Sequence, residues 1–131
     1  MDLNGYRISD GEGDCKFVRS YTLAPMASVT VVRPDSTSIT PFADREGVLR
    51  IGSSNAVFAQ DSYVFSNGGD QVYLYSASGK CVDAICYGNK SIDDASVWRG
   101  AAVSISGNNA FIVRVGTSDT DTAKDWAVQK G

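Results

Sequence analysis

Short runs of β-branched and aromatic residues recur along the chain, each bounded by Gly, Asn, Asp or Pro. In several runs, apolar and polar residues alternate with the period of two that a half-buried strand requires. No stretch places apolar residues at sustained helical spacing between capping residues, so long helices are not expected. The pattern predicts strands near Gly5–Ser9, Cys15–Tyr21, Ser28–Arg33, Gly47–Ile51, Gln71–Ser76, Lys80–Tyr87, Ala102–Ile105 and Ala110–Val115.

Turn-forming residues separate the predicted strands. Ser78 and Gly79 join the two strongest runs, and we expect a two-residue hairpin turn in which the glycine supplies the positive φ. The segment Pro34–Pro41 is polar and bracketed by prolines, which predicts a loop. Single helical turns are considered only at Asn55–Gln60 and in Thr120–Ala127. The fold class that follows is all-β.

The alternation also divides the strand residues between a core and an outer face. The inward set is Val29, Val31, Val72, Leu74, Val82, Ala84, Cys86, Phe111, Val113 and Val115, joined by Tyr6, Ile8, Phe17, Leu23 and Trp126. The outward set is Thr30, Tyr73, Tyr75, Asp83 and Arg114. Burial of each large apolar side chain contributes about 1.5–3 kcal/mol. A core of this size fits one domain spanning residues 1–131.

Charge and hydropathy narrow the set of partners. Twelve Lys and Arg against fifteen Asp and Glu give a net charge of −3. The one-sided basic surface that drives phosphate binding is missing, so nucleic acid is not an expected partner. No apolar run approaches the roughly 20 residues that span a bilayer.

Histidine is absent from the sequence. Ser-His-Asp and Cys-His nucleophilic sites and His-based zinc sites are therefore excluded. Paired carboxylates for glycoside hydrolysis would need a cleft that holds them about 5–9 Å apart, and the acidic residues here fall in predicted turns. We expect no enzyme, and we assign no catalytic, cofactor-binding or metal-binding residue.

The three cysteines, Cys15, Cys81 and Cys86, are an odd number. They allow one disulfide and a free thiol, or three free thiols. Cys81 and Cys86 are separated by an odd number of positions on one predicted strand, which places them on opposite faces. Three thiolates without histidine give only an incomplete zinc site. We interpret the three as thiols that are buried or have no chemical role.

Two acidic segments resemble parts of calcium sites. In the first, Asp10, Glu12 and Asp14 alternate with glycine, as oxygen ligands do in a calcium loop. The distal bidentate carboxylate of such a loop does not follow, so a solvated hairpin turn is the favoured interpretation.

The second acidic segment holds Asp119, Asp121 and Asp125, which could gather around calcium. The interleaved threonines favour another interpretation. Asp and Thr side chains at a turn or a helix start commonly bind local backbone groups. We therefore expect capping here rather than a metal site.

Four aromatic residues, Tyr73, Tyr75, Tyr87 and Trp98, could form a stacking platform for sugars or unpaired bases. Cross-strand aromatic pairs on a half-exposed sheet are the commoner outcome. The packing interpretation is favoured over a ligand platform.

Several fragments, in order along nearly the whole chain, resemble the lamin-tail domain of nuclear lamins and of many bacterial and archaeal surface proteins. The opening D-L-N-G-Y-R-I-S-D resembles the family's D-L-S-G-W-x-L-x-D. Further likenesses are Y-T-L-A-P with the following V-T-V-V, S-N-G-G-D-Q-V-Y-L, and the stretch Gly79–Gly88 with Val82, Asp83 and Tyr87 in register. The segment D-T-D-T-A-K-D-W at Asp119–Trp126 resembles the family's closing motif.

The resemblance implies an immunoglobulin-like antiparallel β-sandwich of the prokaryotic or archaeal type. It implies a non-catalytic interaction or targeting module that binds protein or polymer surfaces, outside the cytoplasm or at the cell surface. One alternative is an accessory domain of a phospholipase D-like, nuclease or other hydrolase whose catalytic part lies outside this chain. Another alternative is a calcium- or carbohydrate-binding module.

The resemblance begins late, because family members usually carry one or two further strands before the position of Asp2. A sandwich lacking its first strands would leave a sheet edge exposed, and exposed edges recruit other strands. We expect a homodimer through that edge. The alternative is that Pro34–Ala43 or the C-terminal segment refills the gap.

Overall fold

The computed structural model describes residues 1–32, 48–50, 58–60, 65, 68–105 and 110–130. The predicted loop at Pro34–Pro41 lies outside the described residues, as do Arg33, Gly47, Ile51 and Asn55–Val57. None of the described helical residues forms a helix long and apolar enough to cross a membrane.

The described residues form short strands and a single turn of 3-10 helix. The strands are β1 (Arg7–Ser9), β2 (Asp14–Phe17), β3 (Thr30–Val32), β4 (Val48–Arg50), β5 (Phe58–Gln60), β6 (Gly69–Tyr75), β7 (Cys81–Gly88), β8 (Ala110–Arg114) and β9 (Trp126–Lys130). The helical turn η1 (Ala123–Asp125) directly precedes β9. The predicted all-β class is confirmed.

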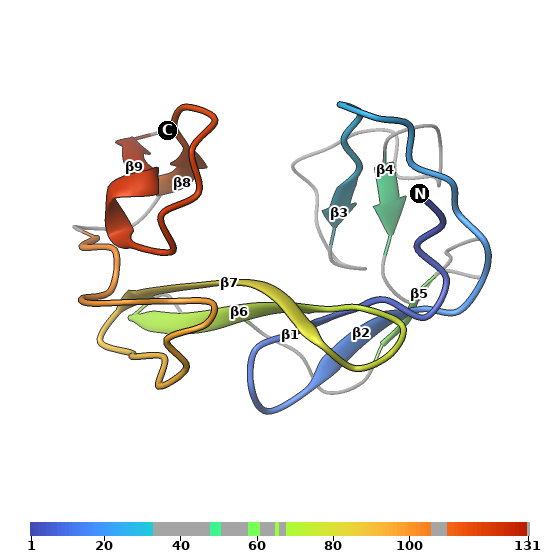
Figure 1. The fold of residues 1–131 in the computed structure, drawn as a ribbon, viewed down its shortest axis with the longest axis horizontal. Coiled ribbons are helices and arrows are strands. Elements are labelled where there is room, and N and C mark those ends of the chain that lie inside the picture. Colours follow the sequence, from blue (N-terminus) through green and yellow to red (C-terminus); the bar gives the residue numbers. More distant parts are fainter. Residues whose placement is uncertain (33–47, 51–57, 61–64, 66–67, 106–109, 131) are drawn as a thin grey trace.

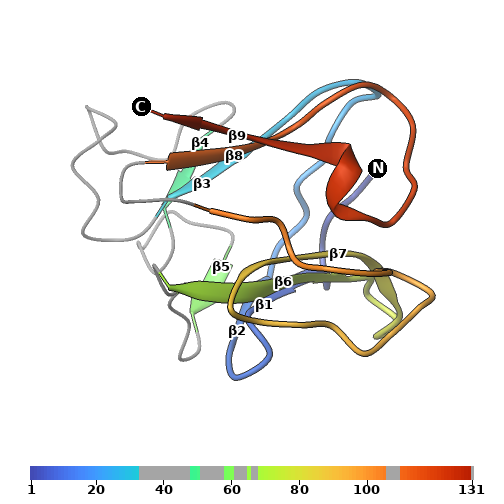
Figure 2. The ribbon, with the colours of Figure 1, turned by 90° about the vertical axis from the view of Figure 1, so that its left-hand side faces the viewer.

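Two layers make up the molecule. One layer is an antiparallel sheet with the strand order β5-β2-β1-β6-β7. On one side of it lie two separate pairs, β3–β4 and β8–β9 (Figures 1 and 2). The β8–β9 pair is antiparallel, whereas β3–β4 is parallel. The arrangement is that of a β-sandwich, as predicted, with one parallel pair in the second layer.

Two apolar clusters hold the layers together. The first is built on Leu3, Cys15 and Phe17, which are at most 6% exposed, and Ile8 and Val31 pack against them. The second is built on Cys86, Trp98 and Val103, which are at most 4% exposed. Burying a Trp side chain and its neighbours removes a large apolar area from water, which stabilises the β7 end of the sheet.

The β6–β7 hairpin is the longest ladder of the sheet and carries an irregularity. The predicted antiparallel pairing is confirmed, and Gly79 has the expected positive φ, +87°. The connection is longer than predicted, since the Ser76 N–H donates to the Lys80 carbonyl over 2.8 Å. Three residues therefore lie between the paired positions, a hairpin length that commonly ends in a glycine with positive φ.

A register shift follows between Leu74 and Tyr75. Leu74 lies opposite Asp83, but Tyr75 lies opposite Cys81. Val82 is thus the extra residue of a β-bulge. Its side chain is 45% exposed, so its predicted inward position is wrong.

The register also corrects the faces of β7. Paired residues of neighbouring strands point to the same side of a sheet. Ala84 is opposite Tyr73, so it is buried on the face away from Leu74, while Asp83 shares the inner face with Leu74. The predicted outward position of Asp83 is therefore wrong. The bulge likewise brings Cys81 and Cys86 onto one face rather than two.

Other boundaries differ from the prediction. The strand that begins near Cys15 ends at Phe17, and Phe58–Gln60 is the edge strand β5 rather than part of a helical turn. The predicted strand Ala102–Ile105 is reduced to a bridge between Val103 and Tyr87. Val115 is 44% exposed rather than buried. The helical turn within Thr120–Ala127 is confirmed as η1, but β9 was not predicted.

Candidate functional site

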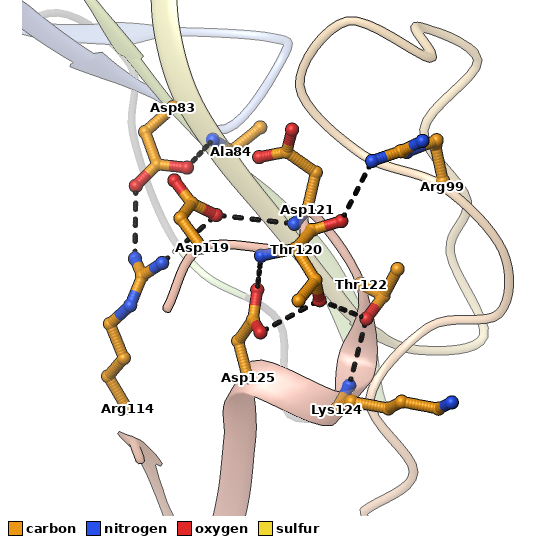
Figure 3. Close-up of polar contacts among 10 residues, drawn as sticks. All are labelled: Asp83, Ala84, Arg99, Arg114, Asp119, Thr120, Asp121, Thr122, Lys124 and Asp125. Atoms are coloured by element: carbon orange, nitrogen blue, oxygen red, sulfur yellow. Dashed lines mark hydrogen bonds and ion pairs between the residues drawn. The ribbon is translucent and has the colours of Figure 1, made fainter. Parts of the chain in front are cut away.

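Three carboxylates converge beside β7. Asp83 comes from β7 itself, whereas Asp119 and Asp121 come from the connection between β8 and η1. One carboxylate oxygen from each lies within 4.8 Å of the others (Figure 3). We call these three residues the acid cluster. Because β7 and the connection belong to different layers, the cluster marks a contact between the layers.

Arg114, at the end of β8, reaches this cluster. Its guanidinium lies 3.0 Å from Asp119 and 3.4 Å from Asp83 (Figure 3). The same group lies 5.3 Å from the ring centroid of Trp126, within cation–π range. The two carboxylates raise the pKa of Arg114 against the opposing effect of burial. Arg114 thus pairs with two of the three carboxylates, and the charge of Arg99 acts on the third, Asp121.

The connection is shaped by the side chain of Asp125, which is 5% exposed. Its carboxylate accepts hydrogen bonds from the Thr120 N–H and hydroxyl, both at 2.8 Å. Thr122 caps η1 by accepting the Lys124 N–H at 3.3 Å. The predicted capping by Asp and Thr side chains is confirmed. The Asp125 carboxylate therefore binds groups of its own loop. The sequence predicted that Asp125 would join Asp119 and Asp121, but the third member of that group is Asp83.

Asp121 is held in an unusual conformation within the acid cluster. It has a φ of +57°, which non-glycine residues other than Asn and Asp rarely adopt. Its N–H donates to the Asp119 carboxylate at 3.2 Å, and its carbonyl accepts the Arg99 N–H at 2.6 Å. Burial, followed by the hydrogen bond and negative charge of Asp119 and the charge of Asp83, raises the pKa of Asp121. The site therefore carries unbalanced negative charge.

A small pocket adjoins the acid cluster. Its volume is about 150 Å³, and it is lined by Val72, Leu74, Asp83, Ala84, Ile85 and Trp126. The lining is apolar except for Asp83, which belongs to both the pocket and the acid cluster. We call it the Trp126 pocket. Small-molecule sites usually measure about 300–1,000 Å³, so this pocket suits a single side chain rather than a cofactor.

The first acidic segment does not converge. Asp10 accepts the N–H groups of Glu12 and Gly13 at 2.8 and 2.7 Å, which closes the β1–β2 turn. Asp14 pairs with Arg7 at 2.8 Å, and Glu12 is exposed. The favoured interpretation of this segment as a hairpin turn is confirmed, although Asp10 itself is only 7% exposed.

The aromatic residues are engaged in packing. Tyr73 and Tyr75 stack with their ring centroids 5.9 Å apart, and the Arg7 guanidinium lies 4.0 Å above the Tyr75 ring. Trp98 is 2% exposed and sits in the second core cluster. The four rings therefore do not gather into one platform. The stacked pair lies within β6 rather than across two strands, so the expected cross-strand pairing is replaced by packing along one strand.

All three cysteines are free thiols, and Cys15 and Cys86 are fully buried. Burial, together with the charges of Asp10 and Asp14, raises the pKa of Cys15 to about 12. Burial also raises the pKa of Cys81 and of Cys86. Thiols with raised pKa values are poor nucleophiles, which agrees with their interpretation as thiols without a chemical role.

Residues of the opening motif have structural tasks. The Asp2 carboxylate accepts the Asn4 N–H, the Ser20 hydroxyl and the Tyr21 N–H at 2.8–3.1 Å. These bonds lower the pKa of Asp2, led by the one from Asn4. Leu3 enters the core beside it. The motif therefore has a structural role in this part of the fold.

Sequence reasoning found Asp119 and Asp121 but missed the Asp83 and Trp126 contributions to one site. The signal for Asp83 was present in the Gly79–Gly88 stretch, where the aspartate is part of the motif. The sequence placed Asp83 on the wrong face of the sheet, because the bulge at Val82 reverses the alternation of inward and outward side chains along β7.

The family model of the Lamin Tail Domain matches residues 1–89 of the chain. The match includes Asp83 and ends before Asp119 and Asp121. No curated protein and no solved structure matches the chain.

Proposed function

The chain belongs to the lamin tail domain family, and we propose that it is an interaction module whose binding surface is the Trp126 pocket with the adjoining acid cluster. The family consists of non-catalytic immunoglobulin-like domains. The partner in this proposal is a protein, bound as an extended or loop segment that inserts one side chain. The location would be outside the cytoplasm or at the cell surface. A place beside a phospholipase D-like or nuclease domain of a larger protein is compatible with the same role.

One observation carries the proposal. The Trp126 pocket joins an apolar lining with a carboxylate that belongs to an under-neutralised cluster. Binding hot spots combine an aromatic wall, a small desolvated pocket and a polar rim in this way. The carboxylates of Asp2, Asp10 and Asp125 lie outside this surface and accept hydrogen bonds from their own loops.

A homodimer remains part of the proposal, but the β7 edge offers it little room. Val103 donates to the Cys86 carbonyl and accepts from the Gly88 N–H along that edge. The Ala84 N–H is already bonded to the Asp83 carboxylate at 2.9 Å. An aspartate that occupies an outward N–H discourages strand addition. A second copy would therefore use another edge than this part of β7.

The proposal is tested with a random peptide library displayed on phage and selected on the immobilised full chain. Amide chemical shifts of the isotope-labelled wild-type chain then map each selected peptide. We expect shifts concentrated at Val72, Leu74, Ile85 and Trp126. Loss of binding on Trp126→Ala but not on Tyr75→Ala would agree. Shifts confined to the Tyr75 face, or no selected peptide, would overturn the proposal. Sedimentation of the chain alone at several concentrations reports whether the chain associates with a second copy.

A further inference from the structure

We propose that the side chain recognised by the Trp126 pocket is a lysine from a basic segment of a partner protein. The inference rests on the proposed function and specifies the chemistry of its partner. The butyl stem would lie against the apolar lining, and the ammonium would reach the acid cluster at the rim. Lysine side chains commonly bury their stem and keep the charged head at a polar boundary.

The pocket geometry selects a slender side chain with a charged end. Four of its six lining residues are aliphatic, Trp126 supplies an aromatic wall, and Asp83 supplies the one charged group. A purely apolar anchor would remove water from the Asp83 carboxylate and add no charge to it beyond its contacts with Arg114 and the Ala84 N–H. An acidic anchor would add repulsion to it. A cationic group over the ring of Trp126 gains a further attraction.

The charge balance points the same way. The acid cluster has three carboxylates, and Arg114 is paired with two of them, Asp83 and Asp119. Within the part of the chain that the structure describes, no ion pair reaches the Asp121 carboxylate. Lys124 does not supply the cation, because its side chain points away from the cluster in Figure 3. Burial, followed by the hydrogen bond and charge of Asp119 and the charge of Asp83, raises the pKa of Asp121, although the charge of Arg99 acts against it.

Arg114 already displays the chemistry of the site. Its guanidinium bridges Asp119 and Asp83 while lying over the ring of Trp126. A partner lysine would use the same combination of carboxylate and ring from the pocket side, with Asp121 as its free anion. The lysine would then be a third cation beside the three carboxylates, after Arg114 and Arg99. Binding should therefore weaken as salt screens the interaction.

The test uses the full chain and synthetic peptides, with amide and indole shifts of Trp126 as the readout. The probe is an amidated acetyl-(Gly-Lys)4 peptide, and the comparison peptide carries norleucine, an uncharged side chain with a similar stem. We expect saturable shifts at Trp126, Ile85 and Asp121 with the lysine peptide. Affinity should fall at least tenfold with norleucine and at least tenfold in the Asp119→Asn/Asp121→Asn double variant.

A matched variant removes two carboxylates elsewhere. Glu12→Gln/Asp93→Asn has the same change in net charge at exposed positions, and it should leave the affinity within about twofold at 0.15 M salt, where distant charges are screened. Equal losses in both double variants would mean attraction to overall charge only and would overturn the proposal. The salt series on the wild-type chain checks the same point.

Two outcomes separate this inference from the proposed function. If library peptides bind the Trp126 pocket through an apolar or acidic anchor, the function stands and the lysine is wrong. If calcium chloride alone saturates the Asp119 and Asp121 shifts and displaces the lysine peptide, the acid cluster is a metal site and the inference fails. If the lysine peptide shifts only residues near Tyr75, both proposals fail.

Discussion

Two arginines on the two faces of the main sheet make the same set of contacts with different results. On the outer face, Arg7 lies 4.0 Å above Tyr75 and 2.8 Å from Asp14. On the inner side, Arg114 lies 5.3 Å from the Trp126 centroid and 3.0 Å from Asp119. Each combines a guanidinium with a ring and a carboxylate. The first set pairs one cation with one anion, while in the second Arg114 pairs with two carboxylates of a cluster of three.

The difference shows what separates a packing contact from a candidate binding surface. Around Arg7 the charges balance, and Tyr75 is covered by Arg7 and stacked with Tyr73. Around Arg114 the surplus charge stands next to an apolar pocket. Residue types alone would have favoured the outer face, with its tyrosines. The residual charge and the pocket shape favour the inner one.

The largest expected effect comes from a substitution in the β6–β7 hairpin, which contributes residues to both faces of the main sheet. Gly88 has a φ of +66°, and an added Cβ would fall against the Gly68 carbonyl oxygen and lie 2.6 Å from the Gly69 Cα. These atoms belong to the backbone and cannot move aside. We expect Gly88→Ala to lower the free energy of unfolding by about 3–4 kcal/mol, measured by urea denaturation. Shifts of both the Tyr75 and the Trp126 resonances should accompany the loss.

A matched control for this substitution is Gly100→Ala. Gly100 also has a positive φ, +85°, but an added Cβ would meet nothing within 4 Å. Only the backbone conformation is then unfavourable, which costs about 1 kcal/mol. If the two variants were equally destabilised, the close approach of Gly88 to residues 68 and 69 would not be a support of the hairpin.

The second effect compares the two arginines directly. Arg7→Gln removes one half-exposed ion pair, so its expected cost is about 0.2–1 kcal/mol. Arg114→Gln removes two ion pairs and leaves three carboxylates facing one another, so we expect about 1–2 kcal/mol at low salt. Thermal unfolding at 0.02 and 0.5 M NaCl measures both. If the two substitutions lowered stability equally, and by the same amount at both salt concentrations, the result would argue against a charge imbalance at Arg114.

The sequence predicted the strand positions better than it predicted the site. Strands such as Gln71–Ser76 and Lys80–Tyr87 were found because alternation and turn residues are local signals. The face of Asp83 was not found, because a single extra residue, Val82, reverses the alternation and leaves no mark in composition. β9 was missed because Trp126–Lys130 follows a capping segment whose local signal favours a helical turn.

The acid cluster was half predicted for a related reason. Asp119 and Asp121 are close in the sequence, so their proximity is a local property. Asp83 joins them only through the contact between layers, which no local pattern encodes. Its spacing in the sequence grouped Asp125 with these residues. However, hydrogen bonds from Thr120 hold the Asp125 side chain within its own loop, away from the acid cluster.

The smallest expected effect concerns the pH dependence of stability and isolates Asp121. Its folded-state pKa is raised, so the folded chain binds the proton more tightly than the unfolded chain does. Ionised Asp121 therefore disfavours folding, and this penalty develops as the pH rises from near 3.8 through the raised value. Asparagine is isosteric, tolerates a positive φ and never ionises. Asp121→Asn should consequently have a higher Tm than the wild type at pH 7 and nearly the same Tm well below pH 3.8.

The direction distinguishes Asp121 from carboxylates with lowered pKa values, such as Asp2 and Asp94, whose hydrogen bonds stabilise the fold above their pKa. As the pH falls, protonation of Asp2 and Asp94 destabilises the wild type and Asp121→Asn equally. The difference in Tm between these two proteins therefore reports the contribution of Asp121 alone. Asp93→Asn, at an exposed position, controls for removing one negative charge from the chain. A Tm gain that appears equally in Asp93→Asn would come from net charge. A gain that grows as the pH falls would have the wrong sign and would contradict the raised pKa of Asp121. A gain confined to Asp121→Asn at neutral pH would show that burial and the neighbouring carboxylates disfavour ionised Asp121 at its place in the acid cluster.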